Sequence, residues 1–179
     1  MKKLTHSQIL QERLTPEEAL KARRCPFSVL LVNIRSLYNV GSIFRSADAC
    51  LAESIILTGF TPYPPRKEIT KTSLGAVDSV PGRYEKDAIT AIEQERQAGK
   101  RIFALELTDK KRLFNTLTAE EFPICFVLGN ELTGLDKDIL DLCDDAVEIP
   151  MLGVKHSFNV SVAAGTLMVE ASLKSPKII

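Results

Sequence analysis

The sequence predicts an α/β protein built on a parallel sheet that is covered by helices on both faces. Short runs of apolar, often β-branched residues alternate with segments of helical periodicity, separated by loops that carry Gly or Pro. Continuous apolar strands of this kind are typical of parallel sheets that are buried on both faces. The chain has 179 residues, 45% of them hydrophobic, which is enough for one domain with a substantial core.

The N-terminal segment, up to about residue 24, is expected to be helical. Thr15 is placed to cap a helix, with Pro16 at its first position and Glu18 completing a capping box. Strands are expected at residues 28–32, 54–58, 101–106, 124–128 and 146–149. Helices are expected at residues 40–52, 88–98, 136–142 and about 160–173. The expected organisation is an N-terminal helical extension (1–27) followed by one α/β domain (28–179).

Composition and termini narrow the possible classes of protein. No apolar stretch has the length of a membrane span, and the polar residues after Leu4 do not fit a signal peptide, so we expect a cytoplasmic protein without membrane contact. The formal net charge is +0, from 23 basic and 23 acidic residues, which is less basic than is usual for nucleic-acid-binding proteins. Basic residues nevertheless cluster locally, as at 66–71 and 110–112.

The four cysteines are widely spread, without a CxxC pair or a nearby histidine. We expect them to be buried or half-buried thiols, and we expect no metal site. Common motifs for dinucleotides, P-loop phosphates, zinc proteases and α/β-hydrolases are also missing from the sequence. An adenosine-type cofactor would have to be held in some other way.

Three polar clusters follow predicted strands, where parallel sheets bind their ligands. The first, residues 33–48, contains Asn39 and Arg45. If Asn39 caps the helix that follows, Arg45 lies nearly two turns into it. Spacing alone favours an ion pair between Arg45 and Asp48, three residues on, over an arginine that points into a site.

The second cluster, residues 126–135, contains Asn130 and Glu131 between Gly129 and Gly134. Glycines there would let the backbone approach a ligand closely, although an ordinary turn in which Asn130 and Glu131 act as capping groups fits equally well.

The third cluster, residues 149–165, runs from a strand through a Pro- and Gly-bearing loop into the last helix. Ser157, Asn159 and Ser161 would lie in the first turn of that helix, where such residues usually act as caps. Small residues at 163–165 would let the helix pack closely against a neighbour.

Taken together and in this order, the three clusters resemble the three motifs of the SpoU/TrmH-type RNA 2′-O-ribose methyltransferases of the SPOUT superfamily. The similarity is carried by Leu-Gly-Asn-Glu at 128–131 and by Ile-Pro-Met-x-Gly-x-x-x-Ser-x-Asn-Val-Ser at 149–161, and it covers roughly residues 28–173. Residues 71–76 resemble a secondary signature of the family. The resemblance implies a C-terminal deep trefoil knot, a rare exception to the rule against knotted chains. It also implies S-adenosyl-L-methionine as cofactor, with S-adenosyl-L-homocysteine as product, and a homodimer with sites near the subunit interface.

Functional residues can be transferred from the family motifs position by position. The resemblance implies catalytic roles for Arg45, Asn39, Glu131, Ser157 and Asn159. It implies cofactor contacts for Leu128, Gly129, Asn130, Ile149, Met151, Ser157 and Phe158. Phe158 stands where family members usually have Leu, a change expected to reshape only the adenine pocket.

The implied substrate is RNA and not DNA, because the ribose 2′-hydroxyl distinguishes RNA from DNA. Among RNAs, tRNA is preferred over rRNA as the expected substrate. With about 27 residues before the first strand, the RNA is expected to be recognised by the catalytic dimer and this short extension. Arg45 could act as a base or stabilise the developing oxyanion; the second role is favoured because arginine stays protonated at ordinary pH.

Two alternatives remain. A non-catalytic RNA-binding protein with this fold is disfavoured because Arg45, Glu131 and Asn159 are all present, and a dehydrogenase is disfavoured by the missing glycine fingerprint.

Overall fold

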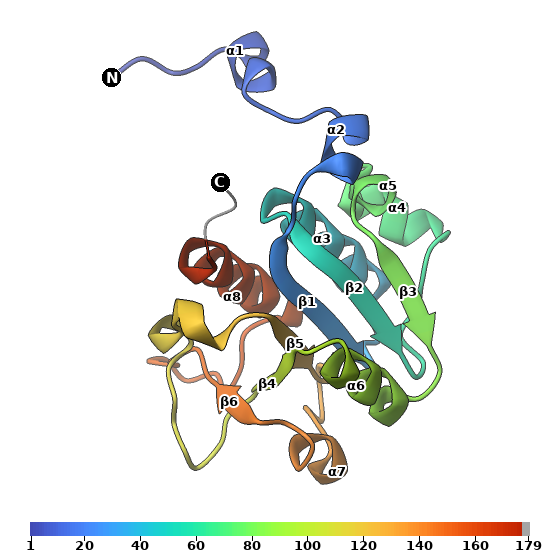
Figure 1. Cartoon of the computed structure of the whole chain (residues 1–179), viewed down its shortest axis with the longest axis vertical. Helices are drawn as coiled ribbons and strands as arrows, with labels where there is room; N and C mark the ends of the chain where they lie inside the picture. Colours follow the sequence, from blue (N-terminus) through green and yellow to red (C-terminus); the bar gives the residue numbers. More distant parts are fainter. Residues whose placement is uncertain (177–179) are drawn as a thin grey trace.

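The computed structural model describes residues 1–176 and has a six-stranded parallel sheet at its centre (Figure 1). The strand order is β3-β2-β1-β5-β4-β6. The strands are β1 (Cys25–Val32), β2 (Ala52–Thr58), β3 (Gly82–Glu85), β4 (Arg101–Leu105), β5 (Ile124–Leu128) and β6 (Asp145–Val147). The α-helices are α1 (His6–Gln11), α2 (Pro16–Lys21), α3 (Leu37–Ala49), α4 (Lys67–Ser73), α5 (Ala76–Ser79), α6 (Ala88–Gln97), α7 (Lys137–Leu140) and α8 (Val160–Lys174). The predicted parallel α/β class is therefore confirmed.

Both faces of the sheet are buried, as the apolar strands predict. Along β1, Phe27, Val29 and Leu31 enter one core, which α3 and α8 cover. Leu30 and Val32, on the opposite face, enter a second core that includes residues of α6 and α7. Because successive side chains of a strand point to opposite faces, a strand buried on both sides must be apolar throughout. This places β1 and β5 at the centre of the domain.

Helix α3 packs closely on two other helices. A Cβ added at Gly41 would lie 2.1 Å from Thr72 Oγ1, next to α4. On another side of α3, a Cβ added at Gly165 of α8 would lie 3.2 Å from Ser46 Oγ. The close packing predicted for the small residues of the last helix is thus confirmed, and it places the first half of α8 against the later part of α3.

Several predicted boundaries are wrong. Helix α3 covers Leu37–Ala49 rather than 40–52, and its N-cap is Ser36, whose hydroxyl accepts the Asn39 N–H at 3.3 Å. Asn39 therefore lies in the first turn and does not cap the helix. Leu51 has a positive φ of 48°, which ends the helix before β2 begins at Ala52. Strand β1 begins at Cys25, opposite Ala52, three residues before the predicted start.

Strand β3 and helices α4 and α5 were not predicted from the sequence. Residues 71–76, which resemble the secondary family signature, run from the end of α4 to the start of α5. A four-residue edge strand such as β3, half exposed, has too little apolar pattern of its own to be recognised.

The N-terminal extension contains two short helices, as expected. The capping box predicted for α2 is confirmed: Thr15 Oγ1 accepts the Glu18 N–H at 3.2 Å, and Glu18 accepts the Thr15 N–H at 2.8 Å. Arg24 then donates to the carbonyl oxygens of Ala19, Ala52 and Ser79, which ties α2 to the domain. Helix α1 buries no residue and projects away from the sheet (Figure 1).

The cysteines and the helix lengths were also part of the sequence prediction. Cys25, Cys50 and Cys125 are buried and Cys143 is half-buried, as predicted. Within residues 1–176, every helix is too short or too polar to cross a membrane.

Candidate functional site

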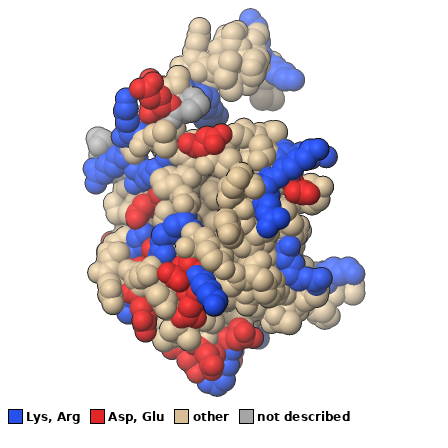
Figure 2. All heavy atoms as spheres, turned by 90° about the vertical axis from the view of Figure 1, so that its right-hand side faces the viewer, with Lys and Arg blue, Asp and Glu red and all other residues tan. Residues whose placement is uncertain are grey.

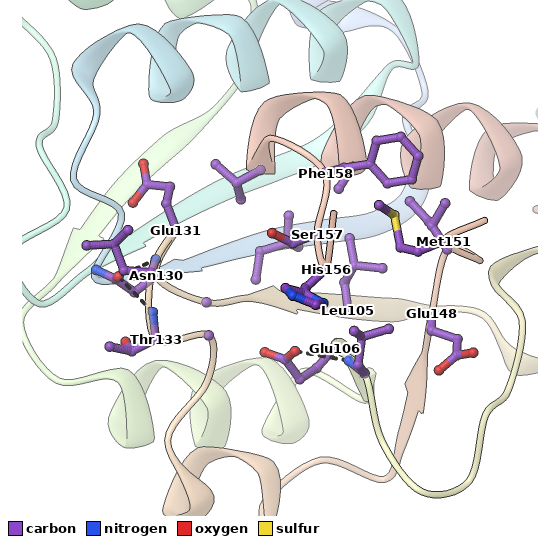
Figure 3. Close-up of a pocket in the computed structure, with 18 residues that line it drawn as sticks. Leu105, Glu106, Asn130, Glu131, Thr133, Glu148, Met151, His156, Ser157 and Phe158 are labelled. Atoms are coloured by element: carbon purple, nitrogen blue, oxygen red, sulfur yellow. Dashed lines mark hydrogen bonds between the residues drawn. The ribbon is translucent and has the colours of Figure 1, made fainter. Parts of the chain in front are cut away.

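A pocket lies at the carboxyl edge of the sheet, beyond β4, β5 and β6 (Figure 3). Its volume is about 320 Å³, within the range of small-molecule sites. It is lined by the ends of β4 and β5, by residues 129–134, by the segment after β6 and by the first turn of α8. The seven residues that the resemblance assigned to the cofactor all line it: Leu128, Gly129, Asn130, Ile149, Met151, Ser157 and Phe158.

Glycines shape the loop after β5. The backbones of Asn130 and Gly134 exchange two hydrogen bonds, of 3.0 and 2.9 Å, which close a tight turn. A Cβ added at Gly129 would lie 2.3 Å from the carbonyl carbon of Gly134, so no other residue fits there without moving the backbone. Gly134 itself has a φ of +70°, and a Cβ there would lie 2.4 Å from Glu106 Oε2. The wall of the pocket thus depends on both glycines.

The side chain of Asn130 holds this loop in place. Its Oδ1 accepts the N–H groups of Leu132 and Thr133, at 2.9 and 3.3 Å, and its Nδ2 donates to the carbonyl oxygen of Asn33 at 2.7 Å. The second of the two sequence interpretations, a turn organised by Asn130, is therefore confirmed, and the approach of the backbone to a ligand stays a prediction. With its amide group engaged in these bonds, Asn130 links the loop after β5 to the loop after β1.

A polar cluster lies beside the pocket, in a shallow hollow lined by Arg35 and Ser36, by Asn39 of α3, by the 131–132 turn and by Asn159. Glu131 accepts hydrogen bonds from Asn39 Nδ2 at 2.9 Å, from the Arg35 N–H at 2.8 Å and from the Ser36 N–H at 3.1 Å. Asn39 Oδ1 in turn accepts from Asn159 Nδ2 at 3.1 Å. One residue from each sequence cluster meets here, over separations of 92 and 120 residues.

The donors around Glu131 also determine its charge. Burial alone would raise the pKa of this carboxyl, but the hydrogen bonds from Arg35, Asn39 and Ser36 outweigh burial and lower the pKa below its ordinary value. Glu131 is therefore a fixed anion at neutral pH, and it holds both the start of α3 and the Asn39 amide in position.

Asn159 has two functions in the structure. It is the N-cap of α8, where its Oδ1 accepts the Ser161 N–H at 2.9 Å, and it reaches Asn39 through its Nδ2. The cap predicted from the sequence is confirmed, and the same side chain belongs to the polar cluster. Ser157, two residues earlier, lines the pocket instead.

Arg45 lies on the exposed side of α3 and lines neither the pocket nor the hollow. The ion pair with Asp48 that spacing favoured is wrong: Asp48 accepts a hydrogen bond from Ser79, and within residues 1–176 no carboxylate lies within 4.0 Å of the Arg45 guanidinium. The guanidinium is thus available to a further molecule.

Four polar or charged pocket residues were not identified from the sequence: Glu106, Thr133, Glu148 and His156. Glu106 follows β4 and accepts the Leu107 and Leu135 N–H groups at 3.0 and 3.1 Å. Because β4 is parallel to β5, its carboxyl end lies at the same edge, and this rule could have identified Glu106. Met151 and Phe158 form the apolar end of the pocket, away from Asn130 and Glu131 (Figure 3).

Comparison with known proteins places this geometry in a family. Residues 26–169 match the model of the SpoU rRNA Methylase family. The chain is 32% identical over 158 residues to the tRNA (guanosine(18)-2′-O)-methyltransferase of Thermus thermophilus, with 87% of this chain and 78% of that protein covered. It is 28% identical over 149 residues to a Bacillus subtilis protein named as a TrmH-family tRNA/rRNA methyltransferase, with 83% of this chain covered.

Solved structures agree with this result. The AdoMet-bound rRNA methyltransferase of Sinorhizobium meliloti superposes with a TM-score of 0.77 at 28% identity, with 89% of this chain and 60% of that chain covered. The chain spans 59% of the Bacillus subtilis relative, so these proteins contain segments beyond the matched part. The family match over residues 26–169, together with the three motifs that meet at one edge of the sheet, shows that the chain belongs to the SpoU methylase family.

Proposed function

We propose that this protein transfers a methyl group from S-adenosyl-L-methionine to a ribose 2′-hydroxyl of structured RNA, with tRNA preferred over rRNA. The observation that carries the proposal is the hydrogen-bonded cluster of Glu131, Asn39 and Asn159 beside a pocket with an apolar end. Two similar proteins support the proposed reaction. The Thermus thermophilus enzyme is a tRNA 2′-O-methyltransferase, and a Sinorhizobium meliloti rRNA methyltransferase binds AdoMet.

The pocket has the chemistry that this cofactor requires. Its apolar side chains, among them Leu128, Met151 and Phe158, suit an adenine ring, and the tight turn at Gly129 exposes backbone groups to a ligand. Glu106 and Glu148 contribute negative charge for a cationic ligand. When bound, the cofactor supplies a methyl group already activated by a positively charged sulfur, so neither a metal nor a covalent enzyme intermediate is needed.

The residues of the chain then bind and orient the ribose. Asn39 and Asn159 offer amide groups at the edge of the pocket, and Glu131 fixes the orientation of Asn39. Ser157, two residues before Asn159, lines the wall of the pocket. Holding a hydroxyl in line with the bond that breaks accounts for a large share of the acceleration in such reactions.

Arg45 is proposed to stabilise the negative charge that develops on the ribose oxygen. A fixed cation supplies this stabilisation without having to lose a proton, which arginine does not do readily. Its exposure and its freedom from ion pairs among the described residues are consistent with this role. Arg45→Lys keeps the charge but loses the planar fork, and it is expected to slow transfer strongly; near-normal turnover would contradict a geometric role.

The working unit is proposed to be a homodimer with a knotted C-terminal part. Exposed apolar residues along α8, including Val162, Val169 and Leu173, support a subunit interface beside α3 and Arg45. The path of the chain supports the knot: after β6 at the sheet edge it returns past the ends of β4 and β5 to α8, which packs on α3.

A direct experiment tests the activity. The protein is incubated with methyl-labelled S-adenosyl-L-methionine and total RNA from cells that lack its gene, and the label is mapped to a nucleotide. We expect label on the ribose of one tRNA position. Failure to label any RNA, with normal RNA binding, would favour a non-catalytic RNA-binding protein. In a thermal shift assay, S-adenosyl-L-homocysteine should raise the melting temperature and NAD should not.

A further inference from the structure

The loop between β2 and α4 presents aromatic side chains to solvent beside the polar cluster. Phe60 is 62% exposed, Tyr63 49% and Tyr84, on β3, 42%. The rings of Tyr63 and Tyr84 stack, with centroids 4.7 Å apart and an angle of 36° between their planes. We call Phe60, Tyr63 and Tyr84 the aromatic platform. Contiguous exposed apolar patches mark binding surfaces, whereas single exposed apolar side chains need no explanation.

The platform is held rigidly. Tyr84 donates its hydroxyl to the Gly59 carbonyl oxygen at 2.6 Å, and the Phe60 N–H donates to Asn33 Oδ1 at 3.2 Å. Thr61, which is buried, accepts the Ile34 N–H at 3.0 Å and donates to the Leu31 carbonyl oxygen at 3.1 Å. Three prolines within residues 62–65 further restrict the backbone. A surface fixed in this way loses little conformational entropy when a ligand binds.

Hydrogen bonds join the platform to the proposed catalytic loops. Asn33, which orients Phe60, accepts Asn130 Nδ2 through its carbonyl oxygen at 2.7 Å. Two residues after Asn33, the backbone N–H of Arg35 donates a hydrogen bond to Glu131. β1 and β2 are neighbours in the sheet, so their carboxyl ends, and the loops that follow them, lie side by side. A molecule in the polar cluster therefore has the platform within reach on one side and the apolar pocket on the other.

The charge around the platform fits a polyanion. Residues 33–47 and 54–67 contain no Asp or Glu but carry Arg35, Arg45, Arg66 and Lys67. These four side chains are exposed, and among the described residues none of them lies within 4.0 Å of a carboxylate. In Figure 2, Lys and Arg lie along the right margin with acidic atoms among them, further Lys and Arg lie at upper left, and Asp and Glu gather mainly at lower left. Arg66 and Lys67 thus directly follow the loop that carries Phe60 and Tyr63, and the acidic residues nearest to the platform in sequence are Glu68 and Glu85.

We propose that the aromatic platform stacks with an unpaired nucleobase of the RNA next to the nucleotide in the polar cluster, while Arg35 and Arg66 bind the adjoining phosphates. Unpaired bases of loops and bulges are recognised by stacking on aromatic rings, and arginine binds phosphate through its planar fork. The proposal rests on the proposed function, and it assigns substrate selection to aromatic residues and Arg66, which lie outside the three family motifs, together with Arg35 of the first motif. It also explains how a chain without net positive charge can bind RNA.

The chain contains no tryptophan, which makes a site-specific test possible. Phe60→Trp keeps an aromatic ring and introduces a single fluorescent reporter at the platform; Gln97→Trp, exposed at the far end of α6, is the matched control. The probe is total RNA from cells that lack the gene. Titration should quench the tryptophan introduced at position 60 and leave that at position 97 unchanged. Equal quenching at both positions, or at neither, would overturn the proposal.

Two substitutions separate stacking from simple apolar contact. Phe60→Ala and Phe60→Leu should each weaken RNA binding on the order of tenfold, because leucine restores apolar volume but no ring. Arg66→Ala should lower the slope of log affinity against log salt by about one. Affinity for S-adenosyl-L-homocysteine, measured by calorimetry, should stay unchanged in all three. Normal RNA affinity in Phe60→Ala, or full rescue in Phe60→Leu, would refute stacking.

The outcome of this test is separable from that of the proposed function. If the wild-type protein methylates RNA but Phe60→Ala does so at the same half-maximal RNA concentration, the platform proposal fails and the enzymatic one stands. If the wild-type protein methylates no RNA but RNA still quenches the tryptophan at position 60, the enzymatic proposal fails and the platform proposal stands. A protein that competes with RNA for the quenching site would identify a different class of partner and contradict the proposal.

Discussion

Glu131→Gln tests whether the carboxylate at the centre of the polar cluster holds the loop after β5 to the start of α3. The carboxylate accepts three N–H donors, from Arg35, Ser36 and Asn39, at 2.8–3.1 Å. Glutamine offers one accepting oxygen, and its NH₂ group would face a donor, so at least one bond is lost and one N–H is left without a partner. Hydrogen bonds to charged groups contribute about 1.5–3 kcal/mol each, less where solvent screens them, as in this half-exposed hollow.

The expected loss of unfolding free energy is therefore about 2 kcal/mol, or a fall in melting temperature of about 4–8 °C for a domain of this size. Chemical and thermal unfolding of the protein without cofactor measure it. Glu93→Gln is the matched control, because Glu93 is exposed on α6 and its side chain forms no hydrogen bond among the described residues. That variant should stay within about 0.5 kcal/mol of the wild type.

The stability difference between wild type and Glu131→Gln should depend on pH. Because the folded protein lowers the pKa of Glu131, the carboxylate contributes stability that is present above the unfolded pKa of about 4.3 and is lost as pH falls through the lower folded value. The gap in stability between wild type and Glu131→Gln should thus be full at pH 7 and should narrow below about pH 4. A gap that is absent at pH 7, or that stays constant down to pH 3, would refute this account of the cluster.

Other substitutions test other parts of the structure. Gly129→Ala should abolish binding of S-adenosyl-L-homocysteine in calorimetry because its Cβ would lie 2.3 Å from backbone, whereas Gly153→Ala, with nothing within 4 Å, should bind normally. Lys100→Met should destabilise the protein by about 3 kcal/mol in urea unfolding, because the buried Glu95 carboxylate loses its 2.8 Å partner but keeps Arg83 at 3.0 Å; a loss below about 1 kcal/mol would contradict this. Ser36→Ala should cost about 1 kcal/mol by removing the N-cap of α3, and a neutral result would mean that Glu131 alone caps this helix.

The central strands could be predicted from the sequence, but the edge of the sheet could not. Strand β5 is predicted at its observed bounds because both of its faces are buried and every residue must be apolar. Strand β3 forms through its register with β2, opposite Ile55 to Thr58, and its own residues alternate between exposed and half-buried. Such a strand is specified by its neighbour rather than by its own pattern, so periodicity does not reveal it.

The start of α3 shows a second limit of sequence reasoning. Ser36 and Asn39 are both good capping residues, and the local sequence does not distinguish them. The choice is made by Glu131, which lies more than 90 residues away and binds the Asn39 side chain as well as the Arg35 and Ser36 N–H groups. Arg45 is a similar case: its spacing to Asp48 suits an ion pair, yet Ser79 from α5 takes that carboxylate.

The family motifs indicated which residues gather at the site, but not that some of them act by holding others. Asn130 uses its amide group to fix its own turn and to bind the Asn33 carbonyl oxygen. Asn33 adopts a φ of 55°, which directs its side chain to the Phe60 N–H. One asparagine in an uncommon conformation thus links the loop of the apolar pocket to the loop of the aromatic platform. Because both loops depend on Asn33, the geometry of the pocket and of the proposed RNA surface cannot vary independently, and a change in one must be transmitted through this residue or break its hydrogen bonds.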